Sequence, residues 1–422
     1  MSPGAAPLAR LARSRGRRRT SRAMRRADVG IVGGAGRVGL PLALVLASKG
    51  RRVLLHDINA QALDAIRRGV MPFAEEGAEP LLAEALAKGR LAFESAPDAD
   101  LAGIPTIVVT VGTPMDEFMN PTLKGMVRVI EPLVPSLADG QLIILRSTVY
   151  PGTTEWLDRH LRSAGRRPKV ACCPERIVQG HAIKELQELP QIVSGTSPEA
   201  EEAAAAFFGQ LAPSVVRLRP MEAEFAKLFC NAYRYIQFAV ANQLYMMVSA
   251  VGLDYYRILE GMQRDYPRMQ GLPGAGLAAG PCLLKDTMQL NAFGDNGFSL
   301  GSAAMFVNEG LPLFIVNQLA KRHDLSDLTV GLLGMAFKAD SDDARSSLSY
   351  KLKKVLRFRA KRVLTTDPHV QGDPDLVPLE TVVAQSDLLI LCIPHQAYRG
   401  LDPRGKPVVD VWNFLGRGGL IS

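Results

Sequence analysis

The chain has 422 residues, of which 47% are hydrophobic and 22% charged, a composition typical of globular proteins that excludes a disordered chain. Its length predicts two or three domains. The net charge of +8 would favour a nucleic-acid-binding protein, but nine arginines and no acidic residue lie in residues 1–27, so the rest of the chain is close to neutral.

The five cysteines lack the paired spacing of zinc sites and of disulfide frameworks. We expect reduced thiols in a reducing compartment, the cytoplasm, and no metal. The basic head, residues 1–27, has no apolar periodicity and is predicted to be disordered. It could be a transit peptide, a nucleic-acid-binding arm or an extension from a start codon assigned too early; we favour the last, with Met24 as the true start.

The first ordered segment, "DVGIVGGAGRVGLPLALVLASKGRRVLLHDIN", predicts a strand, a glycine turn, a helix and a second strand that ends at Asp57. Further strands are expected in "PTIVVTVGTP", "QLIILRSTV" and "KVACCPE", with helical stretches between them. Such alternation predicts a parallel, doubly wound sheet, here a dinucleotide-binding domain over residues 28–215.

From Glu222 to Leu259 a long helical pattern replaces the strands. Its most apolar part, "YIQFAVANQLYMMVSAVGL", is interrupted by three amide side chains, which favours a buried or interface helix over a membrane span. We expect a central domain over residues 216–322 that forms a homodimer.

After Asp327 four apolar runs, "LTVGLLGMAF", "KRVLTTDP", "SDLLILCIP" and "PVVDVW", predict the strands of a smaller α/β domain over residues 323–422. The predicted fold class is therefore α/β, with two Rossmann-like doubly wound domains joined by a long central helix.

A cofactor site is predicted at "GGAGRVG", where Gly34, Gly36 and Gly39 meet the pattern G-x-G-x-x-G. Gly34 would allow the tight turn, Gly36 the approach of a pyrophosphate, and Gly39 close packing of the helix on the strand. Asp57 follows about 20 residues later, where a carboxylate accepts hydrogen bonds from the ribose hydroxyls and repels a 2′-phosphate. The pattern predicts NAD as cofactor in preference to NADP.

Two pairs of residues four apart suggest a chemical site. Lys227 and Asn231 would share one face of the long helix, and Cys282 and Asp286 one face of a helix after "GLPGAGLAAGP". Near that helix start, the helix dipole favours the thiolate form of Cys282. The local pattern leaves two readings of Cys282 open, a nucleophile or a small packed thiol, and Lys227 alone could be a solvated charge.

The order of motifs decides between these readings. The glycine turn, "VTVGTP", "RSTVYPGTTE", "CPERIVQG", "EFAKLFCNAY", "GPCLLKD", "GMAFKADSDDARSS" and "DVWN" follow one another over residues 28–415. In this order the chain resembles the UDP-glucose/UDP-mannuronate dehydrogenase family, the NAD-dependent nucleotide-sugar 6-dehydrogenases. The resemblance implies that a sugar's primary alcohol is oxidised to a uronic acid with two NAD+.

The resemblance also implies roles for individual residues. Cys282 matches the nucleophile that forms a thiohemiacetal and then a thioester. Lys227 and Asn231 match groups that stabilise oxyanion charge, and Asp286 matches a residue that assists proton transfer and thioester hydrolysis. Thr148 matches a threonine that orders water and touches the cofactor.

Glu175 matches a family acid proposed to act in acid–base steps. Implied cofactor contacts, beside the glycines and Asp57, are Arg37, Val38, Thr113, Thr148, Lys285 and Arg345. Implied substrate contacts are Glu175, Arg176, Lys227, Asn231, Arg268, Gly271 and Lys338.

Some residues depart from the family pattern. Gln179 stands where the UDP-glucose branch usually has a second glutamate, and the "PER" form with Arg176 looks closer to the UDP-N-acetylmannosamine dehydrogenase branch. Arg268 either reaches the neighbouring active site of a dimer or is a surface charge.

The expected partner is a UDP-sugar, with neither nucleic acid nor a membrane. Two alternatives are UDP-glucose as the substrate and a single-step 3-hydroxyacid dehydrogenase of the 6-phosphogluconate-like group. A third alternative is an NAD-binding regulator that uses the arginine-rich head on nucleic acid.

Overall fold

The computed structural model describes residues 27–113, 116, 124–416, 418–419 and 421. The predicted disordered head and the Met24 start lie outside the described residues, apart from Ala27. Two compact units divide the chain, Met1–Leu228 and Phe229–Ser422. The division falls inside one long helix, and the domain boundaries predicted at residues 215 and 322 stay predictions.

The first unit is built on a six-stranded parallel sheet in the order β3-β2-β1-β4-β5-β6. This is the strand order of a dinucleotide-binding fold. The strands are short aliphatic runs, mostly buried, as expected where helices cover both faces. Their bounds are β1 Val29–Val32, β2 Val53–His56, β3 Leu91–Glu94, β4 Thr106–Val109, β5 Leu142–Leu145 and β6 Lys169–Cys172.

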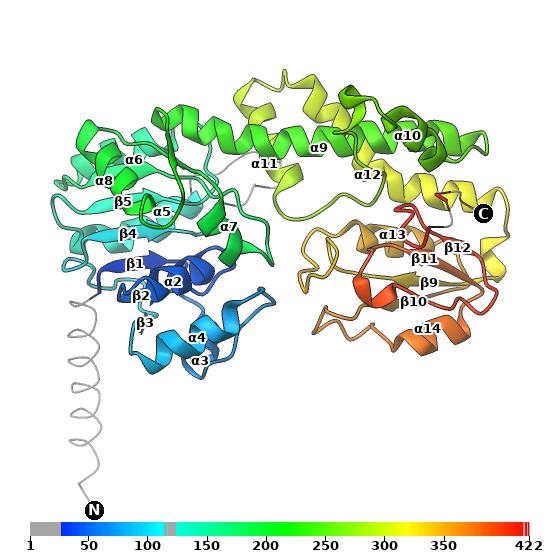
Figure 1. The fold of residues 1–422 in the computed structure, drawn as a ribbon, viewed down its shortest axis with the longest axis horizontal. Helices are drawn as coiled ribbons and strands as arrows, with labels where there is room; N and C mark the ends of the chain where they lie inside the picture. Colours follow the sequence, from blue (N-terminus) through cyan, green and yellow to red (C-terminus); the bar gives the residue numbers. More distant parts are fainter. Residues whose placement is uncertain (1–26, 114–115, 117–123, 417, 420, 422) are drawn as a thin grey trace, which may run out of the picture. The chain divides into compact units, whose positions relative to one another are not determined.

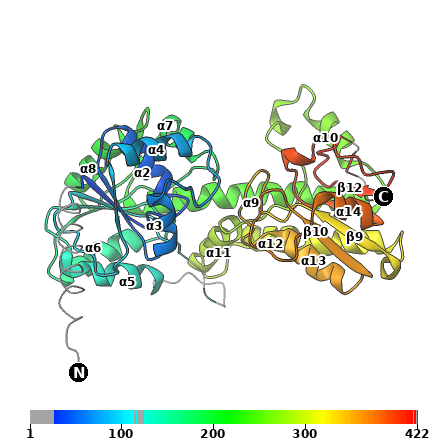
Figure 2. The ribbon, with the colours of Figure 1, turned by 90° about the horizontal axis from the view of Figure 1, so that it is seen from below.

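Helices cover the two faces of this sheet (Figures 1 and 2). One core cluster joins the sheet to α2, α4, α7 and α8, and a second joins its other face to α5, η1 and α6. The bounds are α2 Gly39–Ser48, α3 Ala60–Arg67, α4 Ala78–Ala87, α5 Lys124–Ile130, η1 Glu131–Ser136, α6 Thr153–Ser163, α7 Ala182–Glu188 and α8 Pro198–Phe208.

Three strands of the first unit were not predicted. β3 completes the sheet edge, and β7 Gln191–Val193 pairs in parallel with β8 Val215–Arg217 as a separate two-stranded sheet. All three are short, and β8 is largely exposed, so they lack the continuous apolar run that marks the buried strands.

The predicted long helix is present as α9 Pro220–Ala250, but it is shorter than the helical pattern that continues to Leu259. Gly252 adopts a positive φ of 78°, which ends the helix, and α10 Tyr255–Gln263 begins after it. Asp254 caps α10 by accepting from the Tyr256 N–H at 2.9 Å.

The second unit holds a four-stranded parallel sheet in the order β10-β9-β11-β12. Core clusters place α13 on one face and α14 on the other (Figure 1). The elements are η2 Pro267–Met269, α11 Leu283–Phe293, α12 Ser299–Ala320, η3 Leu325–Asp327, β9 Thr329–Leu333, α13 Leu348–Arg357, β10 Arg362–Thr366, α14 Leu379–Gln385, β11 Leu388–Leu391, η4 Gln396–Tyr398 and β12 Val408–Val409. The predicted fold class, with two parallel sheets and a long helix, is confirmed.

Among the described residues, α12 alone is long and apolar enough to cross a membrane by length and composition. Core helices pass the same test. Side chains of α12 such as Leu311, Ile315 and Leu319 are fully buried against the second unit's core.

Candidate active site and cofactor pocket

The glycine turn has the close approaches that the pattern predicts. A Cβ on Gly39 would lie 2.5 Å from the Gly33 carbonyl oxygen, and one on Gly34 would lie 2.9 Å from the Ile31 carbonyl oxygen. The left-handed residue, however, is Gly33, with φ of 86°. The tight turn therefore depends on Gly33, while Gly34 is needed because backbone crowds it.

Asp57 lies at the end of β2 and is tied to the glycine turn. Its Oδ2 accepts from the Ala35 N–H at 3.0 Å and its Oδ1 from the Asn59 N–H at 2.9 Å. A cavity of about 390 Å³ opens beside it. The cavity is lined by Gly33, Gly36, Asp57, Ile58, Thr110, Gly112, Arg128 and Pro132, among others.

These features fit an adenosine moiety. The volume lies in the range of small-molecule pockets, Gly33 and Gly36 line the cavity beside the start of α2, and Asp57 is half-buried in its lining. Val38 is the N-cap of α2, and Arg37 lies over the Phe73 ring at 4.9 Å. Arg37 and Val38 thus lie beside the turn, and their contacts with the cofactor stay predictions.

Exchanging Asp57 for asparagine should weaken the preference for NAD. The amide can still accept from Ala35, but it loses the charge that strengthens ribose hydrogen bonds and repels a 2′-phosphate. We expect kcat/KM with NAD to fall about tenfold to hundredfold. Parallel kinetics with NAD and NADP measure this, with Asp64→Asn on α3 as the control. An unchanged ratio of the two cofactors would contradict the assigned role.

Two threonines predicted to lie near the cofactor contact each other. Thr113 follows β4 and Thr148 follows β5, and the Thr113 hydroxyl donates to the Thr148 carbonyl oxygen at 2.6 Å. Both lie beyond the carboxyl ends of neighbouring parallel strands, where ligands of open α/β sheets bind.

Glu175 is buried in an ion pair with Arg146, whose side chain is fully buried. Arg146 also donates to the Cys173 carbonyl oxygen at 2.9 Å and to the Gln191 side chain at 2.8 Å. The other Glu175 oxygen accepts from the next two backbone N–H groups at 2.5 and 2.7 Å. This carboxylate is engaged on both oxygens, an arrangement that holds the loop after β6 in place.

Replacing Glu175 by glutamine should therefore cost stability. Arg146 would keep its buried charge without its partner, and breaking a buried pair in this way costs about 3–5 kcal/mol. Urea denaturation of Glu175→Gln measures the loss. Glu188→Gln, which removes a surface partner of Lys184, should change the free energy of unfolding by about 0.5 kcal/mol or less. Equal effects of the two variants would contradict the structural role.

The start of α9 is anchored by Glu224. Its Oε1 accepts from the Thr154 N–H and hydroxyl at 2.8 and 2.6 Å, and its Oε2 from the Gly152 N–H at 2.5 Å. Lys227 follows one turn later and is half-buried, and Asn231 follows after another turn. Both lie on one face of α9, as the spacing predicted.

Cys282 is the N-cap residue of α11, and its side chain is exposed. Its carbonyl oxygen accepts from the Asp286 N–H at 2.8 Å, which closes the first helical turn. Three of the other cysteines differ: Cys172, Cys173 and Cys392 are fully buried, and burial raises the pKa of the Cys173 thiol to about 12. Cys230 is also exposed, but it lies within α9 and not at a helix start. Exposure and the helix start thus separate Cys282 from the packed thiols, as predicted.

Asp286 joins Cys282's helix to α9. It is fully buried, and its Oδ2 accepts from the Asn231 amide at 2.5 Å while its Oδ1 pairs with the Lys285 ammonium at 2.6 Å. The structure thereby brings together three of the predicted residues, from two helices, within one turn of Cys282. A buried carboxylate held between an amide and a cation is suited to directing a proton or a water.

The loop between β9 and α13 carries two further predicted residues, Lys338 and Arg345. Arg345 donates to the Asp343 carboxylate, and this hydrogen bond raises the pKa of Arg345 above its ordinary value. The charge of Cys282 acts in the same direction. Arg345 therefore lies close enough to Cys282 for the two groups to interact electrostatically.

The remaining predicted substrate residues are more dispersed. Arg268, on η2, is exposed and lies over the Tyr266 ring at 5.7 Å. The Gly271 carbonyl oxygen accepts from Gln237 at 3.2 Å, and Arg176 donates to the Pro190 carbonyl oxygen. Within the described residues, these contacts are made with other parts of the chain than the Cys282–Asp286 cluster.

Several residues in the cofactor pocket and around Glu175 were not predicted from the sequence. Gly33 adopts the left-handed conformation, and Arg146 pairs with Glu175 although it is only the first residue of "RSTVYPGTTE". Ile58 and Pro132 line the cofactor pocket from outside the glycine pattern. Ile58 directly follows Asp57 and could have been inferred from that position, whereas Pro132 had no sequence signal.

The chain matches three domain models of the UDP-glucose/GDP-mannose dehydrogenase family: the NAD binding domain over residues 27–211, the central domain over 221–309 and the UDP binding domain over 331–417. UDP-N-acetyl-D-mannosamine dehydrogenase of Pyrococcus horikoshii is 30% identical over 401 residues, 90% of this chain and 94% of that protein. NDP-N-acetyl-D-galactosaminuronic acid dehydrogenase of Ralstonia nicotianae is also 30% identical, over 89% and 94% of the two chains.

Solved structures agree with this relationship. A structure of UDP-D-ManNAc dehydrogenase from Pyrococcus horikoshii has a TM-score of 0.85 at 28% identity, covering 92% of this chain and 95% of that one. A UDP-glucose dehydrogenase from Pyrobaculum islandicum has a TM-score of 0.81 at 29% identity, covering 91% and 94%. The match to the NAD binding domain confirms the predicted cofactor. The chain therefore belongs to the UDP-glucose/GDP-mannose dehydrogenase family and is an NAD-dependent oxidoreductase.

Proposed function

We propose that the protein oxidises the C6 primary alcohol of a UDP-sugar to the carboxylate, and that the sugar is N-acetylmannosamine or a related N-acetylhexosamine. The sugar class is supported by the names of the relatives that match over nearly the whole chain. UDP-glucose is the alternative, since a UDP-glucose dehydrogenase is similar at almost the same level. The observation that carries the chemistry is the exposed Cys282 at a helix start beside the Asn231–Asp286–Lys285 network.

The chemistry balances with one water and two NAD+, which accept the two hydrides. Loss of the first hydride and of the hydroxyl proton turns the alcohol into an aldehyde. The Cys282 thiolate adds to the aldehyde carbon, and the thiohemiacetal loses the second hydride to become a thioester. Water then cleaves the carbon–sulfur bond, which releases the carboxylate and the thiol.

The predicted site residues have matching roles in this proposal. Lys227 and Asn231 stabilise the negative charge that develops on the reacting oxygen. Asp286 directs the attacking water, because its carboxylate is fixed by Asn231 and Lys285 within one turn of the sulfur. Thr148 orders water near the cofactor, and Glu175 fixes the loop that also carries Arg176.

The product ratio tests the proposal. Purified protein is incubated with NAD+ and a panel of UDP-sugars, and NADH is measured by absorbance against the acid formed. Two NADH per acid supports the four-electron oxidation; a value of one supports a single-step hydroxyacid dehydrogenase. The sugar with the highest kcat/KM identifies the substrate.

We also propose that the chain forms a homodimer through α9. Phe229, Tyr233, Val240 and Met247 are spaced by four, seven and seven residues, so they form one stripe, and all are exposed. Tyr233 and Met247 are 63% and 60% exposed. An apolar stripe of this length is typical of an interface between subunits.

Replacing Met247 by glutamate should convert the dimer to monomers. A carboxylate within an apolar interface loses its hydration without gaining a partner. Light scattering coupled to size-exclusion chromatography measures the mass, and Phe358→Glu, at an exposed site away from α9, is the control. A monomeric wild type, or a variant that stays dimeric, would contradict the proposed interface.

The five free cysteines support a reducing compartment, and we propose the cytoplasm. A UDP-linked uronic acid is an activated sugar, so the product would supply polysaccharide biosynthesis.

A further inference from the structure

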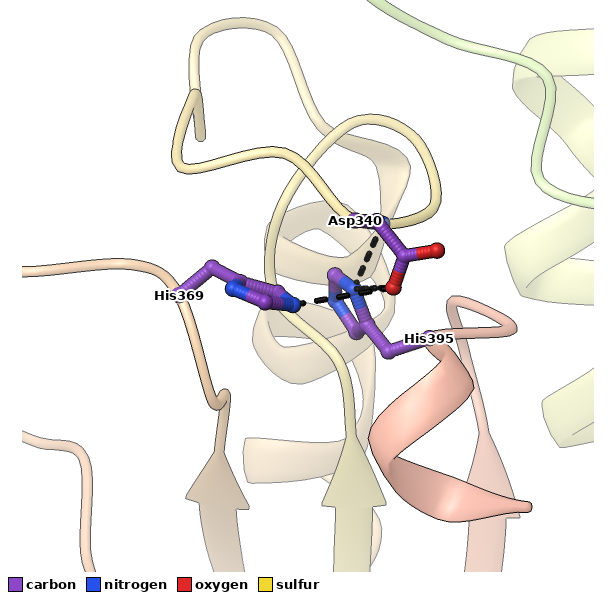
Figure 3. A group of neighbouring side chains, drawn as sticks. All are labelled: Asp340, His369 and His395. Atoms are coloured by element: carbon purple, nitrogen blue, oxygen red, sulfur yellow. Dashed lines mark hydrogen bonds and ion pairs between the residues drawn. The ribbon is translucent and has the colours of Figure 1, made fainter. Parts of the chain in front are cut away.

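Three side chains of the second unit gather beyond the carboxyl ends of its parallel strands. Asp340 follows β9, His369 follows β10 and His395 follows β11 (Figure 3). The Asp340 Oδ1 lies 3.6 Å from the His369 Nε2 and 3.8 Å from the His395 Nδ1. Three such groups could hold a metal ion by composition and spacing.

The hydrogen bonds of His395 argue against a metal. Its Nδ1 accepts from the Asp340 backbone N–H at 2.9 Å, and its Nε2 faces the Asp367 carboxylate at 3.1 Å, to which it must donate. A neutral imidazole has one lone pair and one N–H, and both are used here. His395 is fully buried, so it acts as a hydrogen-bonded bridge between two aspartates.

The first aspartate of the bridge holds the beginning of a loop. The Asp367 Oδ2 accepts from the Met335 and Ala336 N–H groups at 2.6 and 2.9 Å, in addition to His395. Its Oδ1 accepts from the His369 and Val370 N–H groups, both at 2.8 Å. Burial alone would raise the pKa of Asp367, but these hydrogen bonds hold it well below its usual range.

The second aspartate holds the end of the same loop. Asp340 has a φ of 51°, a left-handed conformation that residues other than glycine rarely adopt unless their surroundings fix it. Its N–H donates to His395, and its Oδ1 accepts from the Gln396 N–H at 2.9 Å. The His395 bridge therefore fixes both ends of residues 335–340, which we call the Lys338 loop.

The Lys338 loop is connected to the approach to Cys282. Phe337 packs so closely on Gly280 that a Cβ there would lie 2.6 Å from its ring. Gly280 precedes Cys282 by two residues, and its N–H donates to the Ser346 carbonyl oxygen at 3.4 Å. A shift of the Lys338 loop would therefore move Lys338, which belongs to it. It would also move the segment before Cys282, because Phe337 packs on Gly280.

We propose that His395 is a positioning residue for the UDP-sugar, because it bridges Asp340 and Asp367 and so holds Lys338 and Phe337 in their binding arrangement. The proposal rests on the proposed function and on the contact of Lys338 with the substrate that the family resemblance implies. It assigns no contact between His395 and the substrate itself.

Substitutions of His395 separate positioning from general stability. His395→Phe keeps a ring of similar shape but removes both hydrogen bonds. His395→Asn can still accept from Asp340, and His395→Gln can still donate to Asp367, so each keeps one end of the loop. His369→Phe is the matched control, since it removes the neighbouring ring while its backbone N–H still donates to Asp367.

Steady-state kinetics give the first readout. The KM for the UDP-sugar should rise at least tenfold in His395→Phe and by a smaller factor in the asparagine and glutamine variants. The KM for NAD+ should stay within twofold, and His369→Phe should stay within twofold for both substrates. A sugar KM within twofold of wild type in a folded His395→Phe variant overturns the proposal, and so does an equal rise in both KM values.

Hydrogen exchange gives a readout that needs no turnover. The amides of Met335, Ala336 and Asp340 should exchange at least tenfold faster in His395→Phe and unchanged in His369→Phe. If the wild-type protein oxidises no UDP-sugar, the proposed function is wrong. If the exchange of these amides is unchanged in His395→Phe, the proposed role of the His395 bridge is wrong. A zinc ion retained one per chain after dialysis, and lost in His369→Phe, would also overturn the bridge, because the His395 lone pair would then belong to a metal.

Discussion

Replacing Cys282 by alanine is expected to abolish acid formation, with a fall in kcat for net oxidation of about 10⁴-fold or more. Without the sulfur, the aldehyde cannot become a tetrahedral adduct bonded to the protein, so no thioester forms. The first hydride transfer does not require the sulfur, and a trace of NADH could still form at equilibrium with the aldehyde. Acid is measured by chromatography and NADH by absorbance in the same reaction.

The chain offers a matched control for this experiment. Cys230 on α9 is also an exposed, free thiol, and Cys230→Ala should keep wild-type turnover. Cys282→Ser keeps a weaker nucleophile and should show, at most, slow first-step oxidation. Full acid formation by purified Cys282→Ala would refute covalent catalysis, and equal losses in both alanine variants would indicate a general effect of removing thiols.

Asp286→Asn is expected to lower kcat about 10²- to 10³-fold, with a smaller effect on KM. The amide is nearly the same size, but it places an NH2 group against either Asn231 or Lys285, both of which are donors. It also cannot take a proton from the attacking water. Thioester hydrolysis should become the slow step, so that an acyl-enzyme on Cys282 accumulates.

Mass spectrometry of acid-quenched reactions tests this accumulation. Asp286→Asn mixed with substrate should carry the mass of the sugar acyl group on the Cys282 peptide, while wild type should carry little. Asp295→Asn, at an exposed position beyond the same helix, should behave as wild type. Loss of rate without any acyl adduct would place the role of Asp286 before thioester formation.

The sequence predicted those parts of the fold that depend on local pattern. Both parallel sheets, the glycine turn and α9 follow from apolar runs and glycine spacing, which reflect burial and backbone freedom along short stretches of chain. The end of α9 at Ala250 was missed because the apolar pattern continues past Gly252, whose positive φ stops the helix. Strands β7 and β8 were missed because each is only three residues long.

The sequence predicted which residues belong to the candidate site, but not the hydrogen bonds between them. The spacing of Cys282 and Asp286 places both within one helical turn, and no further information was needed for that. That Asp286 bonds to Asn231 depends on how α11 packs on α9, 55 residues apart in the chain. Arg146 and His395 were overlooked for the same reason, since their partners come from other loops and strands.

The six-stranded and four-stranded sheets each have an aspartate in the same place, but the two carboxylates accept different numbers of hydrogen bonds. In each, an aspartate after the second strand accepts backbone N–H groups from the turn after the first strand. Within the described part of the chain, the Asp57 carboxylate accepts from two backbone N–H groups, those of Ala35 and Asn59, which leaves lone pairs that a ribose could use. The Asp367 carboxylate accepts five hydrogen bonds, which is one more than its number of lone pairs, four. It therefore has no lone pair left for a ligand. We therefore expect one dinucleotide site per chain, and equilibrium dialysis with labelled NAD should saturate at one NAD per chain.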